Sequence, residues 1–271
     1  MSHRRKTALV LGSGGARGWA HIGVIRALKR IGFEPDIVTG TSIGALIGAM
    51  IAADIFDAFD REVATMSPVK LAKFFTEIHF PQAGILSGKP ILEWLKQPHL
   101  LGNRTFADLK KPFAAVATDL YRERAVVLSS GNVAEAVRAS ISIPGVFDPV
   151  VRGDAVLVDG GLVDPVPIKA ARALGAERII AVDINTLLPE EKVPIDGEAP
   201  ALPSMVTTLL QTMRMIENTG CRVMLERDAP DLLLRPAAGH LHTLEFNAGK
   251  SLISAGEAAV AAAQKTLESW L

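Results

Sequence analysis

The sequence predicts an α/β fold in which helices cover both faces of a mainly parallel sheet. The first observation is that predicted strands and helices alternate. The apolar run 7–11 precedes an amphipathic segment, 19–32, whose apolar residues recur every three or four positions. Residues 36–39 and 43–53 repeat this order of strand and helix. Secondly, residues 43–53 are apolar on nearly all sides, which is typical of a buried helix. Lastly, 271 residues suffice for one large α/β domain with a sizeable core.

The remaining elements continue this pattern after an interruption at about residues 54–110, where four prolines punctuate helical and irregular sequence. Strands are expected at 113–118, 125–128, 155–158, 179–182 and 231–235, and helices after Asn132, at 167–174, from Ser204 to about Arg227, and at the alanine-rich end up to Leu271. Residues 188–203 read as an exposed loop. We therefore expect one domain over residues 1–271, with a helical insertion at about 54–110.

Composition narrows the class of protein. The formal net charge is zero, so nothing indicates a nucleic-acid partner. The single cysteine, Cys221, allows no internal disulfide and fits a reducing compartment. The longest apolar stretch, 43–53, is well short of the ~20 residues that span a bilayer. We read the basic, then apolar N-terminus as a first strand, and expect a cytoplasmic protein that could touch membranes peripherally.

Gly40-Thr-Ser42-Ile-Gly44 matches G-x-S-x-G at the junction of a predicted strand and helix. A sharp strand-to-helix turn leaves no room for side chains two residues before and after the bend, hence the glycines. The turn would present Ser42 at a helix N-terminus, where the N–H of Ile43 can stabilise an oxyanion. The alternative is an ordinary junction with an N-capping serine.

A second glycine-rich segment, Gly12-Ser-Gly14-Gly15-Ala-Arg17-Gly18, directly follows the first strand and should emerge at the same edge of the sheet. A dinucleotide loop requires glycine where Arg17 stands, and no Gly-Lys-Ser/Thr closes the segment as in a P-loop. We interpret it as an oxyanion hole facing Ser42. A plain tight turn with Arg17 in solvent and a nucleotide-binding loop stay open as alternatives.

A serine nucleophile needs a base. Of the six histidines, His240 and His242 follow the predicted strands, so the chain order Ser, Asp, His is possible, yet no local signature marks them. Asp159 is the better candidate because it ends an apolar strand and precedes Gly160 and Gly161, which permit close approach. The alternative is an aspartate that merely caps a turn.

These motifs, together with Ala139-Ser-Ile-Ser142-Ile-Pro144, resemble in order those of the patatin-like phospholipases, closest to short bacterial members related to the catalytic domain of neuropathy target esterase. The match runs from about Lys6 to Leu174. The resemblance implies a three-layer α/β/α fold and a Ser–Asp dyad, with Ser42 as nucleophile and Asp159 as base. Carried over position by position, Gly14, Gly15 and Arg17 frame the oxyanion hole. Ser13 departs from the glycine that many relatives have.

The resemblance also implies an activity. Members hydrolyse fatty acyl esters of lipids without a metal or other cofactor, so we expect a lipid acyl hydrolase, lysophospholipase or carboxylesterase that works through an acyl-enzyme. The alternative is a regulatory or scaffolding protein of the same fold. Within the insertion, Leu71, Phe74, Phe75 and Ile78 form an apolar stripe that would line an acyl pocket, touch a membrane or simply pack. The oligomeric state is left open.

Overall fold

The structure, a computed structural model, describes residues 4–65, 84–186, 203–239 and 248–271. The apolar stripe expected at 71–78 lies outside these ranges. Among the described residues, no helix is both long and apolar enough to cross a bilayer.

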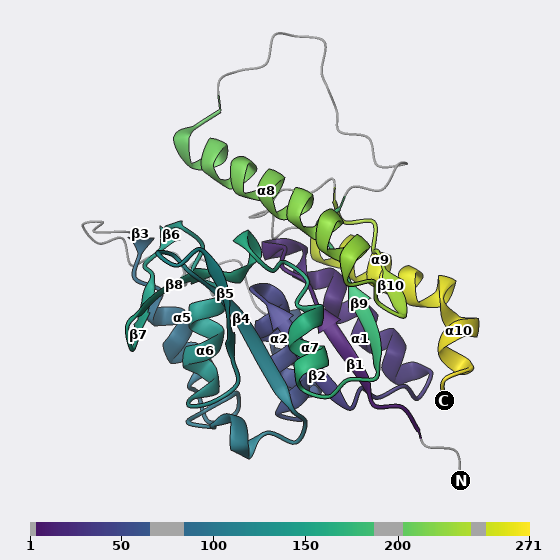
Figure 1. Cartoon of the computed structure of the whole chain (residues 1–271). Coiled ribbons are helices and arrows are strands. Elements are labelled where there is room, and N and C mark those ends of the chain that lie inside the picture. Colours follow the sequence, from purple (N-terminus) through teal and green to yellow (C-terminus); the bar gives the residue numbers. More distant parts are fainter. Residues whose placement is uncertain (1–3, 66–83, 187–202, 240–247) are drawn as a thin grey trace, which may run out of the picture.

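The central sheet has the order β10-β9-β1-β2-β4-β8-β7, with β5 also paired to β4 (Figure 1). Its strands are β1 (Thr7–Leu11), β2 (Ile37–Thr41), β4 (Phe113–Asp119), β5 (Arg124–Leu128), β7 (Val150–Arg152), β8 (Ala155–Asp159), β9 (Arg178–Val182) and β10 (Leu232–Leu234). The five strands from β10 to β4 are parallel, whereas β5 and β8 run antiparallel to β4 and β7 runs antiparallel to β8. A separate pair, β3 (Gly84–Leu86) and β6 (Gly145–Phe147), completes the strands of the described residues.

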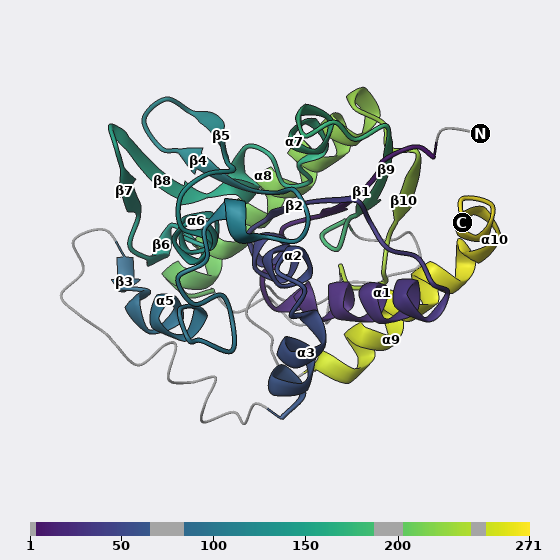
Figure 2. The ribbon, with the colours of Figure 1, turned by 90° about the horizontal axis from the view of Figure 1, so that it is seen from below.

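Helices cover both faces of this sheet, which confirms the predicted three-layer α/β/α fold (Figure 2). The helices are α1 (Trp19–Arg30), α2 (Ile43–Ala52), α3 (Phe56–Ala64), α5 (Lys89–Leu95), α6 (Val133–Ser140), α7 (Ile168–Ala173), α8 (Met205–Arg227), α9 (Gly249–Ala262) and α10 (Gln264–Glu268), with the short 3-10 turns η1 (Gly15–Gly18), η2 (Phe106–Asp108) and η3 (Gly160–Leu162). The larger core cluster lies on the α1, α2 and α9 face, and a smaller one lies beneath α7 and the C-terminal half of α8.

Two of the predicted caps are present. The Asn132 side chain accepts a hydrogen bond from the Glu135 N–H at 3.1 Å, and Ser204 caps α8 in the same way. The single helix predicted at the C-terminal end is wrong, since the chain turns at Ala263 between α9 and α10. The turn allows Leu267 to be buried and brings the ring of Trp270 to 4.4 Å from the guanidinium carbon of Arg178.

The register of the sheet brings two distant segments together. β2 pairs with the first half of β4, where Thr41 is opposite Val116, and β8 pairs with the second half, where Asp159 is opposite Ala117. β5 pairs with residues 115–119 of β4, which overlap the segments paired with β2 and with β8, so β2 and β8 share the opposite edge of β4. They run in opposite directions and meet end to end, so the residues that follow β2 lie beside the end of β8.

Helices α1 and α9 approach each other closely through glycines. A Cβ added at Gly256 would lie 2.1 Å from the carbonyl oxygen of Ala20, and one at Gly23 would lie 2.0 Å from that of Ile253. Neither backbone can yield without separating the two helices. Glycine is therefore needed at this crossing.

We predict that Gly256→Ala lowers the free energy of unfolding by about 2–3 kcal/mol, because the added methyl overpacks the helix crossing. The matched control is Gly220→Ala in α8, where an added Cβ meets nothing within 4 Å. There alanine should stabilise by about 0.5–1 kcal/mol through helix propensity. Urea unfolding followed by circular dichroism measures both; a Gly256→Ala protein as stable as the wild type would contradict the prediction.

Candidate active site

Ser42 lies in a strained turn between β2 and α2. Its backbone has φ 56° and ψ −123°, a left-handed region that non-glycine residues seldom occupy. A Cβ added at Gly40 would lie 2.3 Å from backbone atoms of Gly44, and one added at Gly44 would lie 2.2 Å from the carbonyl oxygen of Leu11. The two glycines of the motif thus permit the sharp bend that presents Ser42.

The Ser42 hydroxyl donates a hydrogen bond to the Asp159 carboxylate, at 2.5 Å between Oγ and Oδ2. Both residues are buried, with exposed fractions of 5% and 2%. The other carboxylate oxygen accepts from the N–H of Gly161 at 2.8 Å, and the backbone N–H of Asp159 donates to the Ser142 carbonyl. Hydrogen bonds to both of its oxygens therefore hold the carboxylate in position.

Burial changes the acidity of Asp159. Desolvation, and then the negative charge of Glu217, raise its pKa from the ordinary value to about 7, while hydrogen bonds from Ser42 and Gly161 act in the opposite direction. A carboxyl with this pKa is partly ionised near neutrality and is a stronger base than an exposed aspartate.

The glycine-rich segment lies beside this pair. Gly14 and Gly15 line the same pocket as Ser42 and Asp159, and Gly15 has a φ of 57°. Gly12 begins the segment by donating to the carbonyl of Val182. Arg17 does not extend into solvent: it is fully buried, and its Nε donates to the carbonyl of Gly14 at 3.1 Å. Its guanidinium therefore holds the segment in shape.

The other motif residues serve close packing around the turn. Ile43 is the first residue of α2, so its N–H has no carbonyl of the helical ladder before it. Gly18 admits the Ile43 side chain, because an added Cβ would lie 2.1 Å from its Cγ1. Gly160 lies against the carbonyl of Val116, at a corresponding distance of 2.2 Å.

Two supporting residues escaped the sequence analysis. The Ser140 hydroxyl accepts from the N–H of Ser42 at 2.8 Å and donates to the carbonyl of Val116 at 2.6 Å, which links the turn to β4. Arg138 is buried and donates to the Ser142 hydroxyl at 2.6 Å. The Ser-Ile-Ser segment was the only signal that could have indicated this support.

The histidines that the structure describes lie apart from the pair. His21 is fully buried in α1, where its Nε2 lies 2.8 Å from the Gly12 carbonyl, and desolvation lowers its pKa to about 4. His99 contacts Glu62 at 3.0 Å. His240 and His242 lie outside the described residues, as do His3 and His79.

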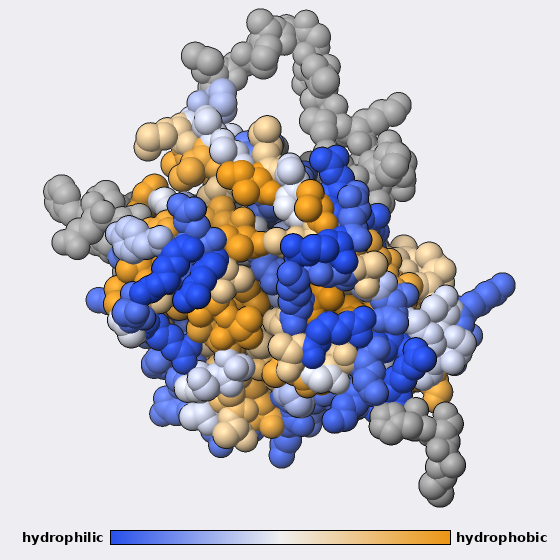
Figure 3. Space-filling view, viewed as in Figure 1, coloured by the Kyte–Doolittle hydropathy of each residue, from blue (hydrophilic) through white to orange (hydrophobic). Residues whose placement is uncertain are grey.

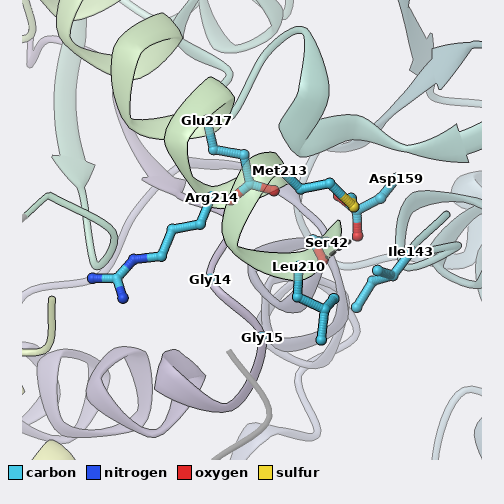
Figure 4. Close-up of a pocket in the computed structure, with 9 residues that line it drawn as sticks. All are labelled: Gly14, Gly15, Ser42, Ile143, Asp159, Leu210, Met213, Arg214 and Glu217. Carbon is cyan, nitrogen blue, oxygen red and sulfur yellow. Dashed lines mark hydrogen bonds between the residues drawn. The ribbon is translucent and has the colours of Figure 1, made fainter. Parts of the chain in front are cut away.

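The pocket over Ser42 is closed by α8, which the sequence could not place. Its lining residues are Gly14, Gly15, Ser42, Ile143, Asp159, Leu210, Met213, Arg214 and Glu217. The last four come from α8, and the side chains of Leu210 and Met213 lie over Ser42 (Figure 4). Within the described ranges, no three histidine, cysteine, aspartate or glutamate side chains gather in a way that could hold a metal ion.

Known proteins resemble this chain in sequence over about two thirds of its length. An uncharacterized NTE family protein of Mycobacterium tuberculosis is 37% identical over 180 residues, which are 66% of this chain and 49% of the relative. Lysophospholipase nte1 of Emericella nidulans is 35% identical over 186 residues, which are 68% of this chain and 12% of that protein. The chain thus spans about half the length of the mycobacterial relative, and far less of the fungal one.

Fold comparison extends the likeness to nearly the whole chain. The crystal structure of VipD from Legionella pneumophila superposes with a TM-score of 0.55 and 14% identity, covering 98% of this chain and 67% of that one. At this identity the likeness concerns the fold alone. Residues 9–172, which include the glycine-rich segment, the Ser42 turn and Asp159, match the sequence profile described as patatin-like phospholipase, and the chain therefore belongs to the patatin-like phospholipase family.

Proposed function

We propose that this chain is a serine acyl hydrolase that cleaves fatty acyl esters of lipids, with Ser42 as nucleophile and Asp159 as general base. The observation that carries the proposal is the 2.5 Å hydrogen bond between Ser42 Oγ and Asp159 Oδ2 at a strained turn beside the glycine-rich segment. Family membership and the lysophospholipase relative support the same reaction class.

The proposed reaction uses the contacts of this site. Ionised Asp159 accepts the hydroxyl proton as Ser42 Oγ attacks the ester carbonyl carbon. Backbone N–H groups of the glycine-rich segment and Ile43 stabilise the resulting oxyanion. Collapse of the tetrahedral intermediate breaks the ester bond, and the leaving alkoxide takes the proton from Asp159. A water then loses a proton to Asp159 and attacks the acyl-enzyme; as the bond to Ser42 Oγ breaks, Asp159 returns the proton to this oxygen, which releases the fatty acid and restores both side chains.

Apolar groups near the pocket support a lipid substrate. Ile143, Leu210 and Met213 provide apolar walls next to Ser42. Along α8, Met205 and Met215 are 84% and 70% exposed, and the hydrophobic surface of this helix is visible in Figure 3. We include peripheral contact between α8 and lipid aggregates in the proposal, because exposed apolar side chains on a helix beside the pocket favour such contact.

A panel of esters tests the proposal. Wild-type protein and Ser42→Ala are assayed side by side with p-nitrophenyl butyrate and with lysophosphatidylcholine, presented below and above its critical micelle concentration. We expect turnover by the wild type alone, with a higher rate on micelles, and labelling of Ser42 by a fluorophosphonate. Absence of both turnover and labelling would favour the regulatory or scaffolding alternative. Equal rates on monomers and micelles would contradict the proposed contact between α8 and lipid aggregates.

The raised pKa of Asp159 predicts a pH dependence. Because only the ionised carboxylate can accept the proton, kcat/KM should rise about tenfold per pH unit below 7 and level off above it. The measurement is kcat/KM for p-nitrophenyl butyrate between pH 5 and 8.5. A flat profile over this interval would show that Asp159 is not the titrating base.

A further inference from the structure

A second carboxylate enters the site from α8. Glu217 is partly buried, and its side chain reaches from the helix toward the centre of the pocket, whereas the guanidinium of Arg214 points away from Ser42 (Figure 4). This residue lies beyond the segment 9–172 that matches the family profile. Its place in the site therefore comes from the structure of this chain.

One oxygen of Glu217 is tied to the glycine-rich segment. Its Oε2 accepts hydrogen bonds from Ser13 Oγ at 3.3 Å and from Asn185 Nδ2 at 3.1 Å, while Asn185 Nδ2 also donates to Ser13 Oγ at 2.9 Å. Ser13 directly precedes Gly14, and Asn185 lies shortly after β9. The triangle joins three separate segments of the chain next to the amides assigned to the oxyanion hole.

The other oxygen of Glu217 lies against the segment that holds Asp159. A Cβ added at Gly161 would be 2.4 Å from Glu217 Oε1, so this carboxylate lies directly against Gly161. The same Gly161 donates its N–H to Asp159 at 2.8 Å. Glu217 thus contacts the residue that fixes the proposed base.

The charges around Glu217 come from three elements. Asp159 faces it from β8 and Arg17 from η1, while Arg214 acts on it from α8 itself. Burial raises the pKa of Glu217, with Arg17 and then the hydrogen bonds from Ser13 and Asn185 acting in the opposite direction. Two carboxyl groups in one small pocket disfavour simultaneous ionisation, so the charge of each opposes that of the other.

We propose that Glu217 is a positioning residue of the active site: it anchors α8 to the glycine-rich segment through Ser13 and Asn185, and its charge sets the pH range in which Asp159 acts as base. The role rests on the proposed hydrolase function. It makes α8 part of the catalytic unit, so chemistry depends on a helix outside the matched family segment.

The decisive variant is Glu217→Gln, which keeps the shape of the side chain and removes its charge. With the wild-type pKa of Asp159 at about 7, kcat/KM at pH 5 should be about one hundredth of its plateau. Without the neighbouring charge, Asp159 ionises at lower pH, so the variant should retain a clearly larger fraction at pH 5. The matched control is Glu226→Gln, the same charge change at an exposed position of α8, which should retain the wild-type profile.

Glu217→Ala tests the anchoring. It removes the acceptor of Ser13 and Asn185 along with the charge, so kcat at the plateau should fall by roughly tenfold to a hundredfold through misplacement of the oxyanion donors, with little change in KM. An unchanged kcat would show that Glu217 does not anchor α8 to the glycine-rich segment.

A measurement without substrate separates this inference from the proposed function. Because both carboxyl pKa values are raised in the folded state, their contribution to stability is present at acid pH and is lost as the pH rises through the folded-state values. The Tm of Glu217→Gln should therefore exceed that of the wild type by a margin that grows between pH 5 and 8, and Asp159→Asn should reduce this margin.

If no ester is turned over, the Tm measurements between pH 5 and 8 still test whether the charges of Glu217 and Asp159 affect each other. If esters are turned over but Glu217→Gln has the wild-type acid limb and a Tm difference independent of pH, Glu217 is a packing residue and the inference is overturned.

Discussion

Ser42→Ala is expected to reduce ester hydrolysis by a factor on the order of 10⁴ to 10⁶, which is the largest effect predicted for any single change in this chain. The substitution removes the proposed nucleophile, and no other hydroxyl is hydrogen-bonded to Asp159 among the described residues. The oxyanion donors alone cannot form the acyl-enzyme. The measurement is single-turnover kinetics with p-nitrophenyl butyrate.

The control for Ser42→Ala concerns the fold. The bond from the backbone N–H of residue 42 to Ser140 does not involve the removed hydroxyl, so the turn should persist. Circular dichroism and Tm should then match the wild type, and Ser251→Ala at an exposed position of α9 should keep full activity. A folded Ser42→Ala protein that still turned over esters at the wild-type rate would mean that the nucleophile lies elsewhere.

Asp159→Asn is expected to reduce hydrolysis by a factor of about 10⁴, because the amide cannot accept the serine proton. The carbonyl oxygen of asparagine can still accept from the Gly161 N–H, which leaves the local geometry intact. Above pH 7 the variant should also be more stable than the wild type, since it no longer buries a charge whose pKa is raised. An inactive protein with a higher Tm would separate the loss of chemistry from unfolding.

The double variant His240→Ala/His242→Ala is the control for the identity of the base. A Ser–Asp dyad requires no histidine, so most of the activity should remain. A folded double variant without activity would replace the dyad with a triad.

The sequence predicts the parts of this site that depend on local stereochemistry. Two glycines flanking a serine between an apolar strand and an apolar helix predict a sharp turn, and the structure has this turn at Ser42. The burial of Arg17 was not foreseen, because a cation in a glycine-rich turn is ordinarily exposed. Its hydrogen bond to the Gly14 carbonyl and its charge next to Glu217 account for the difference.

Contacts between segments far apart in the chain could not be predicted from the sequence. The end-to-end meeting of β2 and β8 depends on how β4 distributes its pairing between them, and no local pattern encodes that register. Likewise, the periodicity of α8 predicts a helix but gives no indication that Glu217 faces Asp159 rather than solvent. Ser140 belongs to a motif that the sequence shows, but its bond to the backbone of Ser42 joins residues 98 positions apart, which no local pattern predicts.

The separation of Ser42 and Asp159 along the chain has a consequence for biosynthesis. The two side chains are 117 residues apart, so a ribosome adding 5–20 residues per second needs roughly 6 to 23 s to supply the carboxylate after the hydroxyl. Throughout that interval the nascent polypeptide carries a serine without its partner. Under the proposed mechanism, the growing chain cannot hydrolyse esters before β8 has been translated and has paired with β4.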